Sequence, residues 1–363
     1  MEANTDVSSK GYYVREGKTG KGIPYKSINL QIVQEKNNRS FVELFGKAGD
    51  IDTLDTDNKK IKINYDDRFD EDVVKSVANF RKINVKIGEE NKSYIASLDA
   101  INYIIDNFDD IKGKTVMVTG QRKKNVYNGK IGDRFEFSAL KEVSDEDVVK
   151  RLTVNTILYF TKDSFDTADW KDEHKLYIHG WTEEYMQDVK ENRYVPQTVV
   201  FDCGKVDWNN EKHVKQVSFR LKMIGCELDE DNKIVVKAKS KKVYKIGVIT
   251  TFINGTEKVE FDESMLTPLQ KEALELGLKT LDDFKPAGSV YGERVVIYKL
   301  KDFDLRKDAG FEDGYVEEDI KLSDFEDKVY IIQELTEDDI VSDDEDDNED
   351  SDDEDSDDDN LFD

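Results

Sequence analysis

The last 28 residues of the chain place the strongest limit on what it can fold into. Residues 336–363 contain 18 Asp or Glu and no Lys or Arg, in a chain whose net charge is −27. Like charges at this density repel one another, and the segment has too few apolar residues to build a core. We therefore expect residues 336–363 to form a disordered acidic tail, with the folded body confined to residues 1–335.

The body has a different charge balance from the tail. Residues 1–300 carry a net charge of only about −2, so local clusters of Lys and Arg can still build a positive surface. A length of 363 residues suggests two domains. No apolar run approaches the roughly 18–20 residues that a membrane span needs. The first 22 residues lack an apolar secretory segment, so we expect a cytoplasmic protein.

Metal and catalytic chemistry find little support in the sequence. Two cysteines, Cys203 and Cys226, do not make a disulfide framework in a chain of this length. The three histidines lack the spacing of zinc ligands. There is no nucleophile elbow and no glycine-rich dinucleotide loop. We expect no enzymatic activity, no metal and no cofactor.

Alternating apolar residues predict strands in the first half of the body. Residues 27–33 and 40–46 flank a polar turn and predict a hairpin. Apolar residues at three- and four-residue spacing over 93–108 predict a helix. Asn128-Gly129 between two further strand patterns predicts a second hairpin. Strands, one helix and a final hairpin are the element order of a small Greek-key barrel of the oligonucleotide-binding (OB) kind.

The second half echoes this order. Its strand candidates are residues 153–160, 174–181, 197–204, 215–224, 243–253 and 292–300, with a helix predicted over 267–284. The predicted fold is therefore mostly β with minor α, as two OB-like Greek-key barrel domains and a disordered acidic tail. The predicted divisions are a flexible N-terminal segment (1–22), a first OB-like domain (23–145), a second OB-like domain (150–335) and the tail (336–363).

Basic residues interleaved with aromatic residues mark candidate contacts to nucleic acid. Cations pair with phosphates, and aromatic faces stack on unpaired bases. The predicted DNA-binding residues are Arg122, Lys123, Lys124, Tyr127, Lys130 and Arg134 on the second hairpin, and Lys205, Trp208, Lys212, Lys215, Phe219, Arg220, Lys222, Lys241, Lys242, Tyr244 and Lys245 in the second half. The alternative is that the hairpin is a solvated face, that Trp208 and Phe219 belong to the core, and that the lysine run is an unliganded loop.

The tail carries one further signal. Its acidic pattern is broken near the end by Leu361 and Phe362. An apolar pair after a one-signed run fits a partner's pocket with a basic rim, because the phenyl ring supplies buried area and the acids steer the approach. The alternative is a tail that only increases solubility.

Barrel-type strands, interleaved basic and aromatic residues and an acidic tail with a near-terminal Phe resemble the replication single-stranded DNA-binding proteins of bacteriophages. Residues 276–305 also look like a phage protein segment. The resemblance implies binding of single-stranded DNA without sequence preference in replication, recombination and repair. It also implies that the tail, through Leu361 and Phe362, recruits replication or recombination proteins and competes with DNA. This chain departs from the family by ending on Asp363 and by having two apparent barrel units.

Two other classes of function stay open at this point. One is an acidic chaperone or DNA mimic, whose tail would bind basic proteins while its body binds no DNA. The other is a phage structural or assembly protein of mixed β fold. Titration with an oligothymidine separates both from a single-strand binder, because only the binder responds.

The composition of the tail generates a first prediction. Deleting residues 336–363 should tighten binding to oligothymidine, because 18 negative charges no longer compete for the cationic surface. The gain should shrink as the Debye length falls from about 30 Å at 0.01 M salt to about 10 Å at 0.1 M. Phe362→Ala should leave DNA affinity unchanged and weaken recruitment of the partner. Fluorescence anisotropy at the two salt concentrations measures this, and weaker DNA binding after truncation would contradict it.

Overall fold

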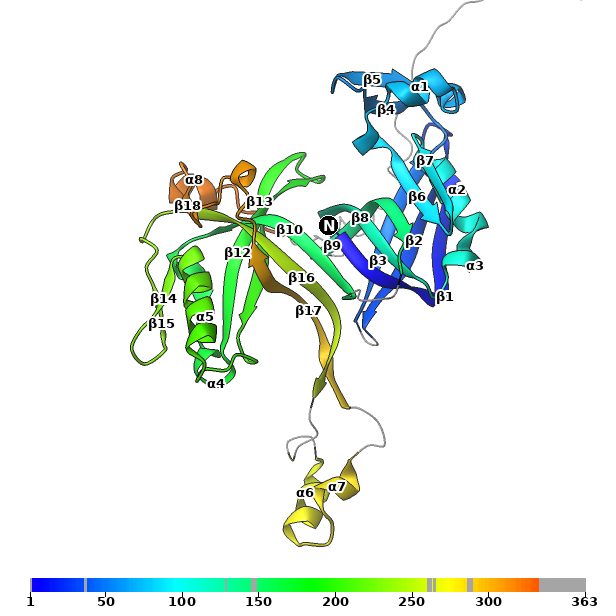
Figure 1. Cartoon of the computed structure of the whole chain (residues 1–363). Helices are drawn as coiled ribbons and strands as arrows, with labels where there is room; N and C mark the ends of the chain where they lie inside the picture. The colour runs from blue at the N-terminus through cyan, green and yellow to red at the C-terminus, as the bar shows by residue number, and fades with distance from the viewer. Residues whose placement is uncertain are drawn as a thin grey trace, which may run out of the picture.

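The chain forms two β-rich lobes that lie side by side (Figure 1). The computed structural model describes residues 2–35, 38–127, 129–144, 149–259, 263, 266–285 and 290–332. One 14-stranded sheet runs through both lobes and curves back on itself in each.

The first lobe is an OB-like barrel of five strands. These strands are β1 (Glu2–Lys18), β2 (Pro24–Glu35), β3 (Asn38–Lys47), β8 (Thr115–Tyr127) and β9 (Lys130–Glu142). Their pairings run β1–β2–β3–β9–β8 and return to β1, so the sheet closes. All pairs are antiparallel except β3–β9, which is parallel. Closure satisfies the backbone groups that would otherwise lie on open edges.

Side-chain alternation fills the barrel. Along β3, Val42 and Leu44 point inward and are buried, whereas Phe41 and Phe45 point outward and are exposed. Strand β2 contributes the buried Ile28, and its partner strands add further branched apolar side chains to one core. Both predicted hairpins of this half, β2–β3 and β8–β9, are confirmed.

A long insertion separates β3 from β8. It contains β4 (Ile51–Leu54), β5 (Lys60–Ile63), η1 (Tyr65–Asp67), α1 (Glu71–Ser76), η2 (Asn79–Arg81), β6 (Ile83–Ile87), β7 (Glu90–Tyr94), α2 (Ser97–Asp106) and α3 (Phe108–Ile111). Helix α2 packs on the barrel through its buried apolar side, including Ile101 and Ile104. It approaches β3 at Gly46, where an added Cβ would lie only 2.3 Å from the Leu98 backbone nitrogen. Only glycine permits that approach.

The second lobe repeats the same order of pairings. Its strands are β10 (Arg151–Phe160), β12 (Lys175–Met186), β13 (Glu191–Asp202), β16 (Tyr244–Val259) and β17 (Val290–Phe303). The pairings run β10–β12–β13–β17–β16 and return to β10. The β13–β17 pair is parallel, in the place that β3–β9 holds in the first lobe. By this order β10, β12 and β13 correspond to β1, β2 and β3.

Shorter elements surround the second lobe. They are η3 (Lys162–Ser164), β11 (Phe165–Asp166), α4 (Trp170–Glu173), α5 (Glu211–Met223), β14 (Cys226–Leu228), β15 (Ile234–Val236), α6 (Pro268–Glu275), α7 (Leu281–Phe284), η5 (Lys307–Ala309), β18 (Val316–Glu317) and α8 (Leu322–Glu326). Helix α5 connects β13 to β16. Strands β16 and β17 extend beyond the lobe and carry α6 and α7 at their far end (Figure 1).

Two sequence predictions are wrong. The N-terminal segment 1–22 was expected to be flexible, but residues Glu2–Lys18 form β1, which is an integral strand of the first barrel. Residues 215–224 were predicted as a strand and lie largely within helix α5. Asn210 caps this helix, since its side chain accepts a hydrogen bond from the Lys212 backbone N–H. Its buried Val217 and Leu221 repeat at four-residue spacing, which outweighs the local alternation.

Backbone and side-chain contacts join the lobes. The start of β1 pairs with the start of β10. The buried Gln34 side chain accepts a hydrogen bond of 2.7 Å from the Leu152 backbone N–H, and Asn38 Oδ1 accepts one of 2.9 Å from Asn254 N. The prediction of a mostly β fold with minor α and an OB-like barrel is confirmed. The predicted acidic tail lies outside the described residues.

The described residues contain no helix long and apolar enough to cross a membrane. Within the same part of the chain, no group of three or more His, Cys, Asp or Glu side chains is arranged to hold a metal ion.

Candidate nucleic-acid interface

The outer face of β1, β2 and β3 exposes aromatic side chains. The exposed fractions are 57% for Tyr13, 52% for Phe41 and 43% for Phe45. Tyr25 lies beside Phe45, with 5.4 Å between ring centroids. Its ring passes over Gly17 on β1, where an added Cβ would lie 2.9 Å from the Tyr25 hydroxyl. Large exposed apolar side chains gathered on one face mark a binding surface rather than a core.

Cations lie among these rings because the strand register places them there. Arg15 and Phe45 are both paired with Ser27, one from each side. Lys47 is paired with Tyr25 on the neighbouring strand. Arg15, Arg39 and Lys47 have no carboxylate partner within the described part of the chain. Their charges are therefore free to meet a phosphate. We call Tyr13, Arg15, Tyr25, Arg39, Phe41, Phe45 and Lys47 the open face.

Two carboxylates, one between Phe41 and Phe45 and one on the neighbouring strand β9, are already paired. Glu43 accepts from the Arg134 guanidinium at 3.0 Å and from the Ser27 hydroxyl at 3.1 Å. Glu136 is paired with Lys123 and, at 3.4 Å, with Arg134. These pairs reduce the repulsion that the carboxylates would exert on a nucleic-acid backbone.

The sequence prediction missed every residue of the open face. In residues 40–46 the two Phe alternate with Val42 and Leu44, so strand periodicity already places them on opposite sides. Tyr13 and Arg15 were missed because their segment was expected to be flexible. The alternation along β3 can be recognised in the sequence. That β1 lies close to β3 is known only from the structure, where both strands pair with β2.

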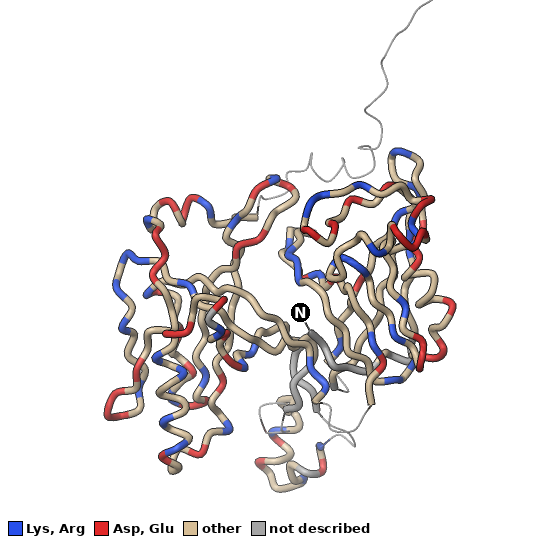
Figure 2. The backbone as a smooth tube through the Cα atoms, turned by 45° about the horizontal axis from the view of Figure 1, so that its top comes forward, with Lys and Arg blue, Asp and Glu red and all other residues tan. Residues whose placement is uncertain are grey.

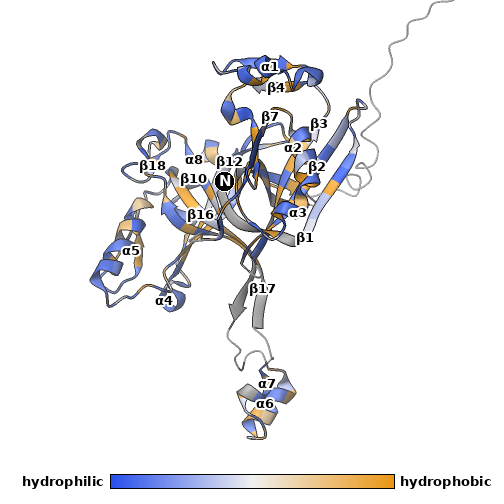
Figure 3. Cartoon of the chain, turned by 45° about the vertical axis from the view of Figure 1, so that its right-hand side comes forward, coloured by the Kyte–Doolittle hydropathy of each residue, from blue (hydrophilic) through white to orange (hydrophobic). Residues whose placement is uncertain are grey.

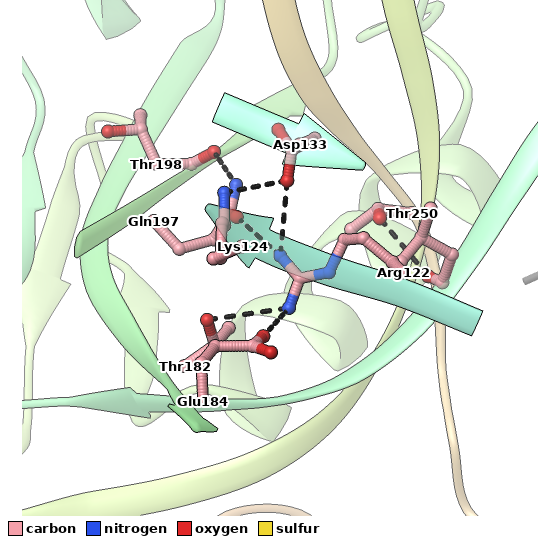
Figure 4. Close-up of polar contacts among 9 residues, drawn as sticks. Arg122, Lys124, Asp133, Thr182, Glu184, Gln197, Thr198 and Thr250 are labelled. Carbon is pink, nitrogen blue, oxygen red and sulfur yellow. Dashed lines mark hydrogen bonds and ion pairs between the residues drawn. The ribbon is translucent and has the colours of Figure 1, made fainter. Parts of the chain in front are cut away.

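The structure removes two predicted contacts from the surface. The side chains of Arg122 and Lys124 are only 5% and 6% exposed. Arg122 contacts Glu184 of the second lobe and donates a 3.0 Å hydrogen bond to Gln197 Oε1 (Figure 4). Lys124 forms a 2.8 Å ion pair with Asp133, which also lies 3.6 Å from Arg122. We call Arg122, Lys124, Asp133, Glu184 and Gln197 the clasp, because their contacts join the two lobes. Both cations are held in the clasp and cannot contact a phosphate in this arrangement.

Burial shifts the protonation equilibria in the clasp. It lowers the pKa of Lys124, although Asp133 acts in the opposite direction. It also raises the pKa of Tyr298 well above its ordinary value, and the nearby Asp133 carboxylate adds to that effect. The Tyr298 ring lies under both cations, 5.9 Å from the Arg122 guanidinium carbon and 5.4 Å from Lys124 Nζ. The clasp is a structural ion network rather than a ligand site.

The remaining predictions on the β8–β9 hairpin have mixed placements. Lys123 is 52% exposed and Arg134 is 39% exposed, both beside the open face. Lys130 is exposed at the end of the hairpin. The side chain of Tyr127 lies outside what the structure describes.

Five predicted residues of the second lobe do come together. Lys205, Lys212, Lys215, Phe219 and Arg220 line a groove of about 590 Å³ between helix α5 and the end of β13. Phe219 is 56% exposed at its edge. We call this site the α5 groove. Helix α5 is hydrophilic over most of its length (Figure 3). Lys and Arg are not confined to this helix but occur on both lobes (Figure 2).

Cations line the α5 groove beside the carboxylates of Asp202 and Asp302, and the floor of the groove is apolar. Phe201, Cys203 and Val217 are buried beneath it. Burial opposes ionisation of Asp202, yet hydrogen bonds from Lys299 and the Gly204 N–H hold the pKa of this carboxyl below its usual range. Burial raises the pKa of the Cys203 thiol to about 12, so it is no nucleophile at neutral pH. The groove therefore combines basic and acidic side chains around an apolar floor.

The other predicted residues of this lobe lie elsewhere. Lys222 and Lys241 are exposed. Lys242 and Lys245 pair with Glu317 at 2.6 Å and Glu318 at 2.5 Å. Tyr244 is buried and its ring lies 5.7 Å from that of Phe160, so it belongs to the core.

Trp208 is half-buried and packs edge-on against Trp170, with ring centroids 5.8 Å apart. Its ring also lies 4.5 Å from that of His174. The two predicted partner-binding residues, Leu361 and Phe362, lie outside the described residues.

Comparison with known proteins adds little at the level of sequence. No protein-family model matches the chain, and no curated protein matches it. Among solved structures the chain is similar to a deletion mutant of the single-stranded DNA binding protein from Thermus aquaticus. The match covers 70% of this chain and 84% of that chain, with 8% identity and a TM-score of 0.28. We base the function on the geometry of the open face instead.

The clasp generates a stability prediction. Arg122→Met should lower the free energy of unfolding by about 3–5 kcal/mol, because it leaves the buried Glu184 without its cation and leaves Asp133 with Lys124 alone. The control is Lys59→Met, whose ion pair with Asp57 is about three-quarters exposed and should matter by less than about 1 kcal/mol. Urea unfolding measures both variants. Unchanged stability with weaker oligothymidine binding would mean that Arg122 contacts DNA.

Proposed function

We propose that this chain binds single-stranded DNA without sequence preference and supports replication, recombination or repair. The observation that carries the proposal is the open face, where three exposed aromatic rings lie among three cations on adjacent strands, and no described carboxylate pairs with these cations. This combination suits a strand whose bases are unpaired, because every base offers a π-face and every phosphate a negative charge. Duplex DNA offers the phosphates but keeps its bases stacked.

The spacing of the rings supports this reading. Phe41 and Phe45 lie four residues apart on β3, which corresponds to about 13 Å along a strand. Tyr13 on β1 is paired with Asn29 on β2, and Asn29 is paired with Glu43 on β3. Since Glu43 lies midway between Phe41 and Phe45, Tyr13 lies two strands away from the midpoint of these two rings. Bases bound to such a platform would be held apart from each other rather than in one stack.

The α5 groove supplies a second candidate contact to DNA. Its cations and Phe219 are the predicted residues that the fold brings together, and Lys222 lies just beyond on the same helix. We keep these residues in the proposal, along with Lys123, Lys130 and Arg134 near the open face. Arg122, Lys124 and Tyr244 leave it, because burial and packing already occupy them.

The equal order of pairings in the two lobes supports a division into two OB-like domains. The proposed domains are residues 23–145, extended by strand β1, and residues 150–335. For residues 336–363 we propose two roles, which rest on composition. Its acidic residues would compete with DNA for cations, and Leu361 and Phe362 would anchor a replication or recombination protein.

The open face generates a binding prediction. Phe41→Ala and Phe45→Ala should each weaken oligothymidine binding by about 1–3 kcal/mol, because each removes a stacking surface. The matched control is Phe80→Ala, which removes a 65% exposed phenyl ring from the insertion and should leave the affinity unchanged. Fluorescence anisotropy with labelled oligothymidine measures the affinities, and duplex DNA of equal length should bind more weakly.

Three outcomes would contradict the proposed function or move its primary site. Equal affinity for single and double strands would remove the role of stacking. Unchanged binding in the Phe41→Ala, Phe45→Ala double variant, with loss of binding in Phe219→Ala, would move the primary site to the α5 groove. A chain that binds no oligothymidine at low salt would favour an acidic chaperone or an assembly protein.

A further inference from the structure

A C-terminal segment lies over the outer face of the second lobe. Residues 316–330, which we call the strap, run from β18 through α8 and are held by backbone hydrogen bonds. Glu318 N donates to Val243 O at 2.9 Å, and Tyr330 N donates to Tyr194 O at 2.8 Å. Tyr194 N in turn donates to Lys328 O at 2.9 Å. The strap is therefore fixed along strands β16 and β13.

One phenyl ring of the strap fills a platform of aromatic rings. Phe325 is only 1% exposed. Its ring centroid lies 4.2 Å from that of Tyr194, 5.2 Å from Trp181 and 6.3 Å from Tyr159. The three rings come from β13, β12 and β10, and Tyr159 is paired directly with Trp181. Three neighbouring strands thus present an aromatic surface to a single inserted ring.

Carboxylates of the strap pair with cations at the rim of this platform. Glu317 pairs with Lys242 at 2.6 Å, and Glu318 pairs with Lys245 at 2.5 Å. Lys245 is the residue paired with Tyr159 on β16, so it lies beside the platform. The strap contains six Asp or Glu and only two Lys. The strap is thus an acidic segment with one buried phenyl ring. Its carboxylates pair with lysines of the second lobe, and its ring contacts aromatic rings of that lobe.

The covered surface is the counterpart of the open face. Strands β10, β12 and β13 take the places of β1, β2 and β3 in the order of pairings. In the first lobe this face is exposed, with Tyr13, Phe41 and Phe45 uncovered. In the second lobe the Phe325 ring of the chain itself packs against the aromatic rings, and carboxylates of the strap pair with lysines beside them.

We propose that the outer face of β10, β12 and β13 is a second binding surface for single-stranded nucleic acid, and that the strap closes it. The ligand class follows from the occupant, since a strand offers the same aromatic and anionic groups at the same contacts. The inference rests on the proposed function only in taking the open face as its counterpart. The covered face can bind a strand only in molecules whose strap has moved away. Its apparent affinity is therefore the intrinsic affinity multiplied by the fraction of open molecules.

The test is Phe325→Ala in the full chain. Removing the ring empties the platform, so the variant should bind one more short oligothymidine per chain than the unmodified protein. The matched control is Phe311→Ala, which removes another buried phenyl ring outside the strap and should add no binding. Stoichiometry is measured by titration calorimetry, with cooperative thermal melting as the check on folding. A folded Phe325→Ala chain that binds no additional molecule overturns the proposal.

A combined variant separates this proposal from the proposed function. In Phe325→Ala with Phe41→Ala and Phe45→Ala, the open face is disabled and the added molecule should still bind. If the unmodified chain binds nothing while Phe325→Ala binds one molecule, the open face fails and the covered face stands. Loss of the added molecule in the combined variant would show that it sits on the open face, and would overturn the covered site.

If Phe325→Ala does not melt cooperatively, hydrogen exchange of the unmodified chain decides. A saturating long oligothymidine should displace the strap and speed exchange of the Glu318, Tyr194 and Tyr330 amides, whose bonds hold it. A duplex of the same length should leave these amides protected. Equal protection with and without the single strand overturns the proposal.

Discussion

Closure of the first barrel is the constraint on which the proposed site depends. The parallel β3–β9 pair completes a ring of strands, so each strand has one side inside and one outside. Val42 and Leu44 fill the inside of β3 with branched apolar side chains. Phe41 and Phe45 must then face outward, and the same alternation on β1 and β2 sets Tyr13 and Tyr25 beside them. The aromatic surface follows from the register of a closed sheet.

The two lobes use one pattern of pairings in different ways. The first leaves its outer face open, whereas the second covers the corresponding face with its own residues 316–330. The clasp around Arg122 joins them through buried charges, which cost stability when one partner is lost. Cationic side chains therefore serve three purposes here. Some are free on the surface, some pair across the lobes, and some hold the strap.

Local patterns in the sequence were enough for much of the fold. Period-two alternation gave the β2–β3 and β8–β9 hairpins, and the three- and four-residue spacing gave helix α2. Residues 215–224 were misread because Val217, Phe219 and Leu221 alternate as in a strand while Val217 and Leu221 also fit a helix. The cap at Asn210 was the signal that distinguishes the two.

The candidate site was harder to predict from sequence than the fold. Charge alone does not distinguish a free cation from a paired one, since two partners of Arg122, Thr182 and Glu184, are about 60 residues away in the chain. Burial of Lys124 likewise depends on how the two lobes meet. Five of the predicted residues line the α5 groove together because one helix and the loop before it carry them. Sites built from distant strands, such as the open face, required the pairings.

The location of a bound strand is the most direct test of this account. Ultraviolet crosslinking of the full chain to oligothymidine, followed by peptide mapping, reports which side chains touch the bases. The account predicts crosslinks at Tyr13, Tyr25, Phe41 and Phe45. Crosslinks confined to the α5 groove, or to the Arg122 clasp, with none on strands β1–β3, would contradict it.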